Sequence, residues 1–370
     1  MQQYGKKIEH RVLILCLRPV ITTSTVEELK LLLAKVTDWQ GLKKIALDHL
    51  VFSSLYRQLA DNCPQEVPAN FLNELHHLYK RHVSTNLVKT AELTQILTLL
   101  QSHDIVAVAY KGPVLAQVAY GDIAYRQFTD LDILVNRGDI DKVKHLLLSQ
   151  GYTLRYSFTK KQKHLHLKHG VEFTFEHSRR TMLDVHWRLA ADYLGGGLGS
   201  EEAIGRRALI QILGKTVYTL HPVDSLLMLC QHGTFHFWST LSTVSDVAHL
   251  IHSQNSWDWP VVLERAKTFG LWRQSLLGLS LAQEWLGAQV PSAIIREAEA
   301  DPTVVAVRRT VKKNLWPRRG DDIGFLEQTV LYISEIDPEA YKNDTFKKDI
   351  FKIKIGQSGY VYLVDSKGTM

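Results

Sequence analysis

Cysteine and long apolar runs are both scarce in this sequence, and each scarcity excludes a class of protein. Only three cysteines occur among 370 residues, at positions 16, 63 and 230. This odd and scattered set fits neither a zinc site nor a disulfide framework, which indicates a reducing cytosol. The apolar run Val12–Leu17 is too short for a membrane span or a signal peptide and is closely flanked by arginine. We therefore expect a cytoplasmic protein with no membrane partner.

A large excess of one charge is also lacking. The net charge is +6, from 44 Lys and Arg against 38 Asp and Glu. Such mild basicity suits a polyanionic ligand such as a nucleotide. It is too diffuse to favour DNA or RNA, so nucleic acid is a less favoured partner that stays open. The length indicates two domains or three small ones.

Helical patterns fill the first hundred residues. Ser24 to Glu27 forms a capping-box pattern ahead of a leucine-rich stretch. Apolar spacing then predicts a helix from about Trp39 to Ala60 and a long helix from about Ala69 to Ser102. An all-helical adaptor has a similar pattern, but we interpret this segment as a scaffold that packs against the next part of the chain.

The clearest chemical signal lies in Lys111–Val135. Asp130 and Asp132 belong to TDLDILV, whose apolar and β-branched residues predict a buried strand. Alternate side chains of a strand share a face, so the two carboxylates point the same way. Paired carboxylates on an apolar strand repel each other and resist desolvation. A hard divalent cation, Mg²⁺ or Mn²⁺, would hold them there.

A second predicted strand, Met182–Trp187, places Asp184 and His186 on one face. Three carboxylates on neighbouring strands are the arrangement that two-metal phosphoryl transfer needs. Asp130 and Asp132 would hold both ions, and Asp184 would complete one site and help to deprotonate the attacking hydroxyl. His186 is a candidate contact to the nucleotide or to the acceptor.

A short apolar run, Ile105–Tyr110, predicts a strand that leads through Lys111 and Gly112 into a helix with Pro113 at its first position. A helix start of this kind receives phosphate on its backbone N–H groups. Lys111 and Gly112 are therefore candidate nucleotide contacts.

Arg126 is a further candidate, because its planar guanidinium matches phosphate oxygens. The alternative is that Lys111 and Arg126 are surface charges paired with Asp104 or Asp122.

Histidines form two groups. The four between residues 164 and 177 match no zinc spacing and have no cysteine nearby, so we expect strand-surface histidines; they are His164, His166, His169 and His177. His232 and His236 share a helix face, but HGTFH lacks the glutamate of a zinc protease. They line the pocket or cap an aromatic cluster, and both interpretations stay open.

Taken in order, these motifs resemble the uncharacterised nucleotidyltransferase family of the DNA polymerase beta-like superfamily. The resemblance covers about residues 10 to 255. Its motifs are Asp38-Trp39, the Asn86 region, Lys111-Gly112, Tyr120-Gly121-Asp122, Arg126, Asp130–Val135, Leu183–Leu189, Leu229–Gly233, His236, Trp238 and Asp246. It implies transfer of a nucleoside monophosphate from an NTP to a hydroxyl, with Mg²⁺ held by Asp130, Asp132 and Asp184. The Gly-Ser phosphate motif of the wider superfamily is absent from the sequence, and Lys111-Gly112 stands in its place.

We expect an α+β protein in which a small mixed sheet is flanked by helical segments. The predicted divisions are a helical segment 1–104, a nucleotidyltransferase core 105–190, a helical domain 191–340 and a tail 341–370 with a strand over Gly359–Val364 and a turn over Asp365–Gly368. Further helices are predicted over 139–150, 201–213, 222–236, 241–253, 259–269, 273–286 and 291–299, and strand-like pieces over 152–158, 164–167 and 171–175.

The expected reaction transfers AMP from ATP to an acceptor hydroxyl and releases pyrophosphate, with Lys111 and Arg126 neutralising the phosphates. ATP is the default donor because no motif reads the base. The acceptor is left open among small molecules, peptides and proteins.

Two other classes remain as alternatives. A nucleotide-binding regulator would show a metal-dependent thermal shift with NTP but no pyrophosphate release. A helical interaction protein with an incidental acidic strand would gain stability from Asp130→Asn combined with Asp132→Asn, because repulsion is relieved.

Overall fold

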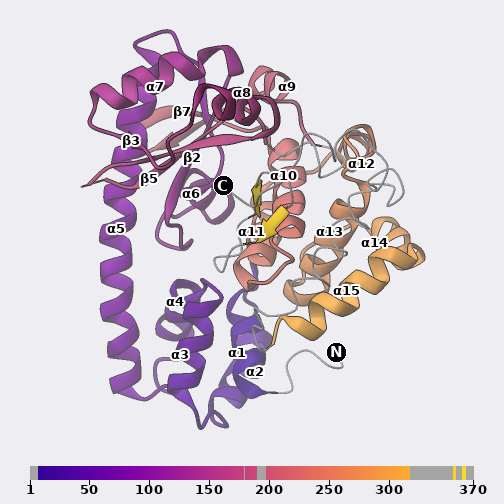
Figure 1. Cartoon of the computed structure of the whole chain (residues 1–370). Helices are drawn as coiled ribbons and strands as arrows, with labels where there is room; N and C mark the ends of the chain where they lie inside the picture. The colour runs from indigo at the N-terminus through magenta and orange to yellow at the C-terminus, as the bar shows by residue number, and fades with distance from the viewer. Residues whose placement is uncertain (1–6, 179, 190–196, 317–352, 356–360, 364–370) are drawn as a thin grey trace.

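The computed structural model describes residues 7–178, 180–189, 197–316, 353–355 and 361–363. The chain is an α+β protein with a small mixed sheet and helical segments before and after it. Figure 1 shows the sheet at the upper left, the N-terminal helices below it and the C-terminal helices on the right. One long helix runs along the left side and connects the lower helices to the sheet.

The N-terminal segment forms α1 (Ile8–Cys16), α2 (Thr23–Leu33), α3 (Trp39–Asp48), α4 (Phe52–Asn62) and α5 (Ala69–Gln101). The long predicted helix is confirmed by α5. The single helix predicted from Trp39 to Ala60 is wrong, because the chain turns at Leu50, whose φ of 57° is left-handed. The predicted cap is also displaced: Thr22, not Ser24, accepts a hydrogen bond from the Thr25 N–H, at 3.2 Å.

The five-stranded sheet has the order β1 (Ala107–Ala109), β2 (Asp130–Val135), β5 (Met182–His186), β4 (Glu172–Glu176) and β3 (Thr153–Leu154). Only β2 and β5 are parallel among its neighbouring strands, and the other pairs are antiparallel. A parallel pair needs a long crossover connection. Here it includes α7 (Ile140–Ser149), which confirms the helix predicted over 139–150. The mixed sheet was thus correctly predicted.

Between β1 and β2 the chain forms the four-residue helix α6 (Gly112–Leu115) and then the π-helical turn η1 (Ala116–Tyr120). Pro113 was predicted at the first position of this helix and is its second residue, within the first turn. The left-handed Gly121 ends η1, with a φ of 72°.

Two further predicted elements are wrong. The strand predicted over 164–167 lies in the helix α8 (Lys160–His169), which starts at a capping box formed by Thr159 and Gln162. The helix predicted over 201–213 ends as α9 (Ser200–Gly205) and is followed by the hairpin of β6 (Ala208–Ile212) and β7 (Lys215–Thr219). The turn residues Leu213 and Gly214 both have positive φ, 46° and 72°, which is the backbone of a tight hairpin.

The C-terminal helices are α10 (Pro222–Phe235), α11 (Leu241–Ser253), α12 (Trp259–Thr268), α13 (Trp272–Leu286), α14 (Ser292–Ala300) and α15 (Pro302–Asn314). The first five match predicted helices closely, whereas α15 was not predicted. Asp301 caps α15 and accepts hydrogen bonds from the Thr303 and Val304 N–H groups at 2.9 and 3.1 Å.

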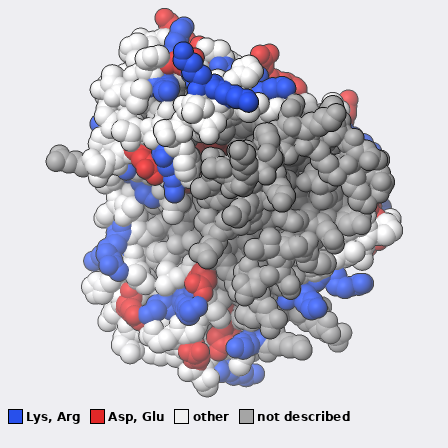
Figure 2. Space-filling view, in the orientation of Figure 1, with Lys and Arg blue, Asp and Glu red and all other residues white. Residues whose placement is uncertain are grey.

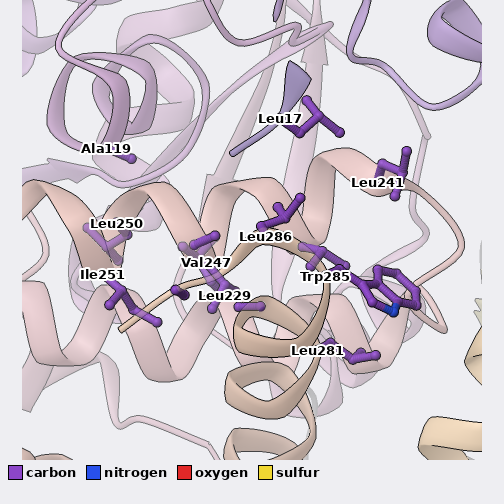
Figure 3. Packing of buried hydrophobic residues seen from close by; sticks show 14 of the residues in the cluster. Leu17, Ala119, Leu229, Leu241, Val247, Leu250, Ile251, Leu281, Trp285 and Leu286 are labelled. Atoms are coloured by element: carbon purple, nitrogen blue, oxygen red, sulfur yellow. The ribbon is translucent and has the colours of Figure 1, made fainter. Parts of the chain in front are cut away.

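Two apolar clusters hold these elements together. One lies against the sheet and joins it to α5, α7 and the β6–β7 hairpin. The other contains side chains of both helical segments, so the two segments share a core although the sheet separates them in the sequence. Figure 3 shows part of this shared core, where Leu17, Ala119 and Leu229 come together from distant parts of the chain.

The remaining predictions concern the C-terminal tail and the domain boundaries. Within the predicted terminal strand, β9 (Val361–Leu363) pairs antiparallel with the preceding strand β8 (Ile353–Ile355), a pairing that the sequence did not indicate. The predicted turn Asp365–Gly368 lies outside the described residues, as do the predicted domain boundaries at 190 and 340.

Candidate active site

The two central strands bring the predicted acids together. In the parallel pair of β2 and β5, Asp132 lies directly opposite Asp184. Partners in register point to the same face of a sheet. Both side chains are buried, with relative exposures of 3% for Asp132 and 8% for Asp184. The structure therefore places two carboxyl groups side by side on apolar strands, as predicted.

Asp132 is neutralised by two neighbours. Lys111 donates from Nζ to its Oδ1 at 2.6 Å, and His186 Nε2 lies 3.2 Å from the same oxygen. Burial raises the pKa of Asp132, but the Lys111 ammonium and His186 outweigh burial and hold that pKa below its usual range. Asp132 is thus a stable carboxylate.

Asp184 has the opposite environment. Its Oδ1 is buried and has no hydrogen-bond partner in the described chain. Burial, followed by the charge of Glu172, raises the pKa of Asp184 to about 7. A buried oxygen of this kind is a site where a cation would be stabilised.

The donor set fits a hard cation, because Asp130, Asp132 and Asp184 offer the carboxylate oxygens that Mg²⁺ prefers. Within the described ranges, however, no three His, Cys, Asp or Glu side chains are already gathered to hold an ion. The Lys111 ammonium lies on Asp132 instead. A cation shared between Asp132 and Asp184 would therefore compete with the Lys111 ammonium for the charge of Asp132.

Asp130 lies at the start of β2 and is half-buried. Burial, and then the charge of Asp132, raises the pKa of Asp130. Its carbonyl oxygen would lie 3.3 Å from a Cβ added at Gly112, whose φ is +53°. Gly112 therefore lets the Lys111 turn approach the start of β2, which is a packing role additional to the predicted phosphate contact.

His186 connects two acids. Besides Asp132, it contacts Glu172, with 3.0 Å between His186 Nδ1 and Glu172 Oε2. Burial lowers the pKa of His186, but Glu172 and Asp132 together raise it above its usual value. In the structure His186 is thus held by carboxylates, and its predicted contact to nucleotide or acceptor remains a proposal.

Sequence reasoning missed Glu172. It lies opposite His186 in the antiparallel register of β4 and β5. A signal was present, because residues 171–175 were predicted as a strand in which Glu172 alternates with apolar side chains. The order of the strands, which places β4 beside β5, was not visible in the sequence.

Arg126 is held by the C-terminal helices. Its Nε lies 3.0 Å from both carboxylate oxygens of Asp246 on α11, and Tyr120 donates its hydroxyl to Asp246 at 2.9 Å. The alternative pairing with Asp122 is wrong, since Asp122 accepts a hydrogen bond from Arg57 at 3.2 Å. Arg126 connects the loop before β2 to α11.

Three side chains on one face of α5 hold the loop that leads into β2. His82 Nε2 lies 3.0 Å from the Ala124 carbonyl oxygen. Asn86 donates to the carbonyls of Ile123 and Arg126 at 2.6 and 3.0 Å. Lys89 donates to the carbonyls of Phe128 and Thr129 at 2.8 and 3.2 Å. The start of β2, and with it Asp130, is thereby fixed to α5.

The predicted histidine groups also have definite positions. His164, His166 and His169 lie on α8 rather than on a strand, and His166 Nε2 is 2.7 Å from the Glu172 carbonyl oxygen. His232 and His236 lie at the end of α10 with their ring centroids 4.4 Å apart.

The charged side chains on the surface are mixed in sign. On the face drawn in Figure 2, the described Lys and Arg side chains are interspersed with Asp and Glu and form no continuous basic surface.

Across the described residues, none of the helices is both long enough and apolar enough to span a membrane.

A family model described as "Uncharacterised nucleotidyltransferase" matches residues 35–287, which is more than half of the chain and includes every predicted site residue. No curated protein matches the sequence.

Proposed function

The chain belongs to this uncharacterised nucleotidyltransferase family, and on that premise we propose that it transfers AMP from ATP to an acceptor hydroxyl and releases pyrophosphate. Nucleotidyl transfer is the activity that the family match supports. The donor, the acceptor and the need for Mg²⁺ or Mn²⁺ are the proposed part. The observation that carries them is the register of Asp132 against Asp184, with an unpartnered Asp184 oxygen beside an ion-paired Asp132.

Asp130, Asp132 and Asp184 would hold the metal. When bound, Mg²⁺ or Mn²⁺ would polarise the phosphate oxygens and offset their charge. Lys111 is a cation that already lies on Asp132. We propose that it transfers its hydrogen bond to a phosphate oxygen when the nucleotide binds, so that the carboxylate becomes available without ever lying buried and unpaired.

The acceptor oxygen forms a bond to the α-phosphorus of ATP, and the bond between this phosphorus and the bridging oxygen of pyrophosphate breaks. The proton of the hydroxyl goes to Asp184 Oδ1. The Asp184 Oδ1 has no hydrogen-bond partner in the described chain and lies opposite Asp132, which supports this role because it leaves the oxygen available to accept a proton.

Other residues hold the geometry. His186 binds Asp132 and Glu172 and so fixes the carboxylate orientation. Arg126 is proposed to contact phosphate while Asp246 orients its guanidinium from α11. Gly112 allows the Lys111 turn to approach β2. We also propose a cytoplasmic location, since the three cysteines are buried free thiols.

The test measures pyrophosphate release and transfer of label from α-labelled ATP, with Mg²⁺ or Mn²⁺ and a fractionated cell extract as the acceptor source. Asp132→Asn and Asp184→Asn are each expected to lower turnover by at least about a hundredfold. The control is Asp141→Asn, an exposed aspartate on α7. Wild-type turnover in Asp132→Asn would refute the proposal. A metal-dependent thermal shift with ATP but no pyrophosphate release would instead identify a nucleotide-binding regulator.

A further inference from the structure

Two histidines at the end of α10 have no assigned role. His232 and His236 are half-buried and lie one helical turn apart, with their rings in a T-shaped contact. The two rings contact each other, and His236 also contacts the Phe235 ring. Within the described chain neither imidazole is hydrogen-bonded. Half-buried rings with unused donors and acceptors can bind a ligand.

The pair lies beside the candidate active site. Tyr110, the residue before Lys111, shares a buried cluster with Leu226 and Leu229 of α10. The charges of Lys111, Asp132 and Arg126 act on His232, and the charge of Lys111 also acts on His236. The end of α10 therefore lies within electrostatic range of the Lys111–Asp132 pair.

The end of α10 is held in a strained backbone conformation. Phe237 and Trp238 both have left-handed φ, 56° and 51°, although neither is glycine. Each such residue costs about 1–2 kcal/mol, and strain of this kind is retained mainly at functional sites. The Trp238 ring lies so close to Gly233 and Gly278 that an added Cβ would approach it to 2.6 and 2.8 Å, respectively. This packing fixes the backbone at the end of α10 and with it the position of His236.

The charge state of His232 and His236 limits the class of ligand that they can bind. Burial, and then the neighbouring His236 and Lys111, holds the pKa of His232 well below its usual value, and burial with Lys111 lowers the pKa of His236 to about 4. Both rings are therefore neutral at pH 7. A neutral ring lacks the charge that strengthens a hydrogen bond to an anion. The nearby Lys111 and Arg126 are paired with Asp132 and Asp246, so neither side chain adds an uncompensated charge that would favour an ionic ligand. Each neutral imidazole offers one donor and one acceptor, which matches a hydroxyl group.

We propose that His232 and His236 form the acceptor subsite, and that this subsite binds a neutral polyhydroxylated molecule of the sugar class. The proposal rests on the nucleotidyl transfer proposed above and names its acceptor. Two donors and two acceptors on adjacent rings match two neighbouring hydroxyl groups. A hydroxyl of the same molecule forms the new bond to the α-phosphorus, pyrophosphate leaves, and the hydroxyl proton goes to Asp184 Oδ1.

The experiment uses the full chain with α-labelled ATP, Mg²⁺ and a panel of acceptors. The panel contains neutral hexoses, a cyclic polyol and neutral disaccharides, and it also contains a sugar phosphate, an aminoglycoside and a tyrosine peptide. The variants are His232→Ala, His236→Ala and the corresponding glutamine changes, which keep one neutral donor and one acceptor. His252→Ala is the control, since His252 is exposed on α11.

Label is expected on a neutral member of the panel. Each alanine variant should raise KM for that acceptor about tenfold, as expected for one lost hydrogen bond of about 1.4 kcal/mol, and should leave KM for ATP unchanged. The glutamine variants should recover part of the affinity, and His252→Ala should behave as wild type. Label only on charged or peptide acceptors, or wild-type acceptor KM in both alanine variants, would overturn the inference.

A second measurement separates this inference from the proposed function. The ¹H–¹⁵N signals of the histidine rings are recorded while the neutral panel members are titrated into the protein without ATP. If the protein transfers no label to any acceptor, the proposed function fails, yet shifts confined to His232 and His236 would still support a sugar site. If these signals do not move with any neutral sugar or polyol, the subsite does not exist.

Discussion

Asp132 and Asp184 face each other in register across parallel strands, and their surroundings favour opposite charge states. Asp132 is paired with Lys111 and His186. Asp184 has an unpartnered oxygen and a pKa of about 7. The same conservative substitution should therefore change stability in opposite directions at the two positions.

We expect Asp132→Asn to lower the free energy of unfolding by about 3 kcal/mol, because it leaves the Lys111 ammonium buried without a partner charge. Asp184→Asn should raise it by about 1–2 kcal/mol, because it removes a poorly solvated carboxyl group. Urea denaturation at pH 7.5 in the presence of EDTA measures both changes in the free energy of unfolding. A stabilising Asp132→Asn would show that the ion pair with Lys111 does not form, and would agree with the interaction-protein alternative.

The second prediction concerns Asn86. Asn86→Ala removes two hydrogen bonds to the loop before β2 and leaves two carbonyl oxygens without a donor. The expected cost is about 2–3 kcal/mol of stability, with a fall in kcat larger than any change in KM for ATP, because Asp130 comes directly after that loop. Asn70→Ala, on the exposed first turn of α5, is the control. Equal activity of Asn86→Ala and Asn70→Ala would mean that this loop does not position Asp130.

The third prediction concerns Gly112. Gly112→Ala adds a Cβ 3.3 Å from the Asp130 carbonyl oxygen at a φ of +53°. The backbone strain alone should cost about 1–2 kcal/mol, and displacement of Lys111 should raise KM for ATP. Gly138→Ala is a matched control, because an added Cβ there meets nothing within 4 Å. Thermal melts and ATP titrations of both variants check this, and a wild-type melting temperature in Gly112→Ala would contradict it.

The fourth prediction is a loss of stability in acid through His249. Burial lowers the pKa of His249 from 6.5 to about 4, while its ring stacks on Tyr120 at 4.2 Å and its Nε2 lies 3.2 Å from the Leu17 carbonyl oxygen. Between these two values the unfolded chain binds a proton that the folded protein does not, so stability falls as the pH falls from about 6.5 towards 4.

The ring is only half-buried, so its share of the loss is about 1–3 kcal/mol. His249→Gln should flatten the decline of unfolding free energy measured by urea denaturation from pH 7.5 to 4.5. His164→Gln, which changes an exposed histidine on α8, should leave the decline as it is in the wild type. An identical decline in His249→Gln and wild type would show that His249 is not the group responsible.

Local sequence patterns were sufficient to predict the sheet, the long helix and the shared face of the acids. The TDLDILV pattern predicts β2, and MLDVHW predicts β5, because a period of two residues and β-branched content are properties of the segment itself. The β6–β7 hairpin was missed although Leu213 and Gly214 mark its turn. Its apolar residues also fit a helix, and only packing against the sheet separates the two interpretations.

Partners from distant segments could not be predicted. Glu172 reaches His186 only because β4 pairs with β5, and Asp246 reaches Arg126 only because α11 packs against η1. Strand order and helix docking depend on the summed packing of many side chains rather than on a local pattern. The charge of Arg126 was therefore visible in the sequence, whereas its partner was not.

The 33-residue helix α5 connects the N-terminal helices to the sheet, and the number of residues in it sets the direction in which its later side chains point. Its first half packs against α4, and its donors at His82, Asn86 and Lys89 meet fixed carbonyls further along. Each added residue rotates everything beyond it by about 100°. One alanine inserted near Leu78 would therefore turn these donors away from the loop while every side chain remained present, whereas an inserted heptad would restore their direction.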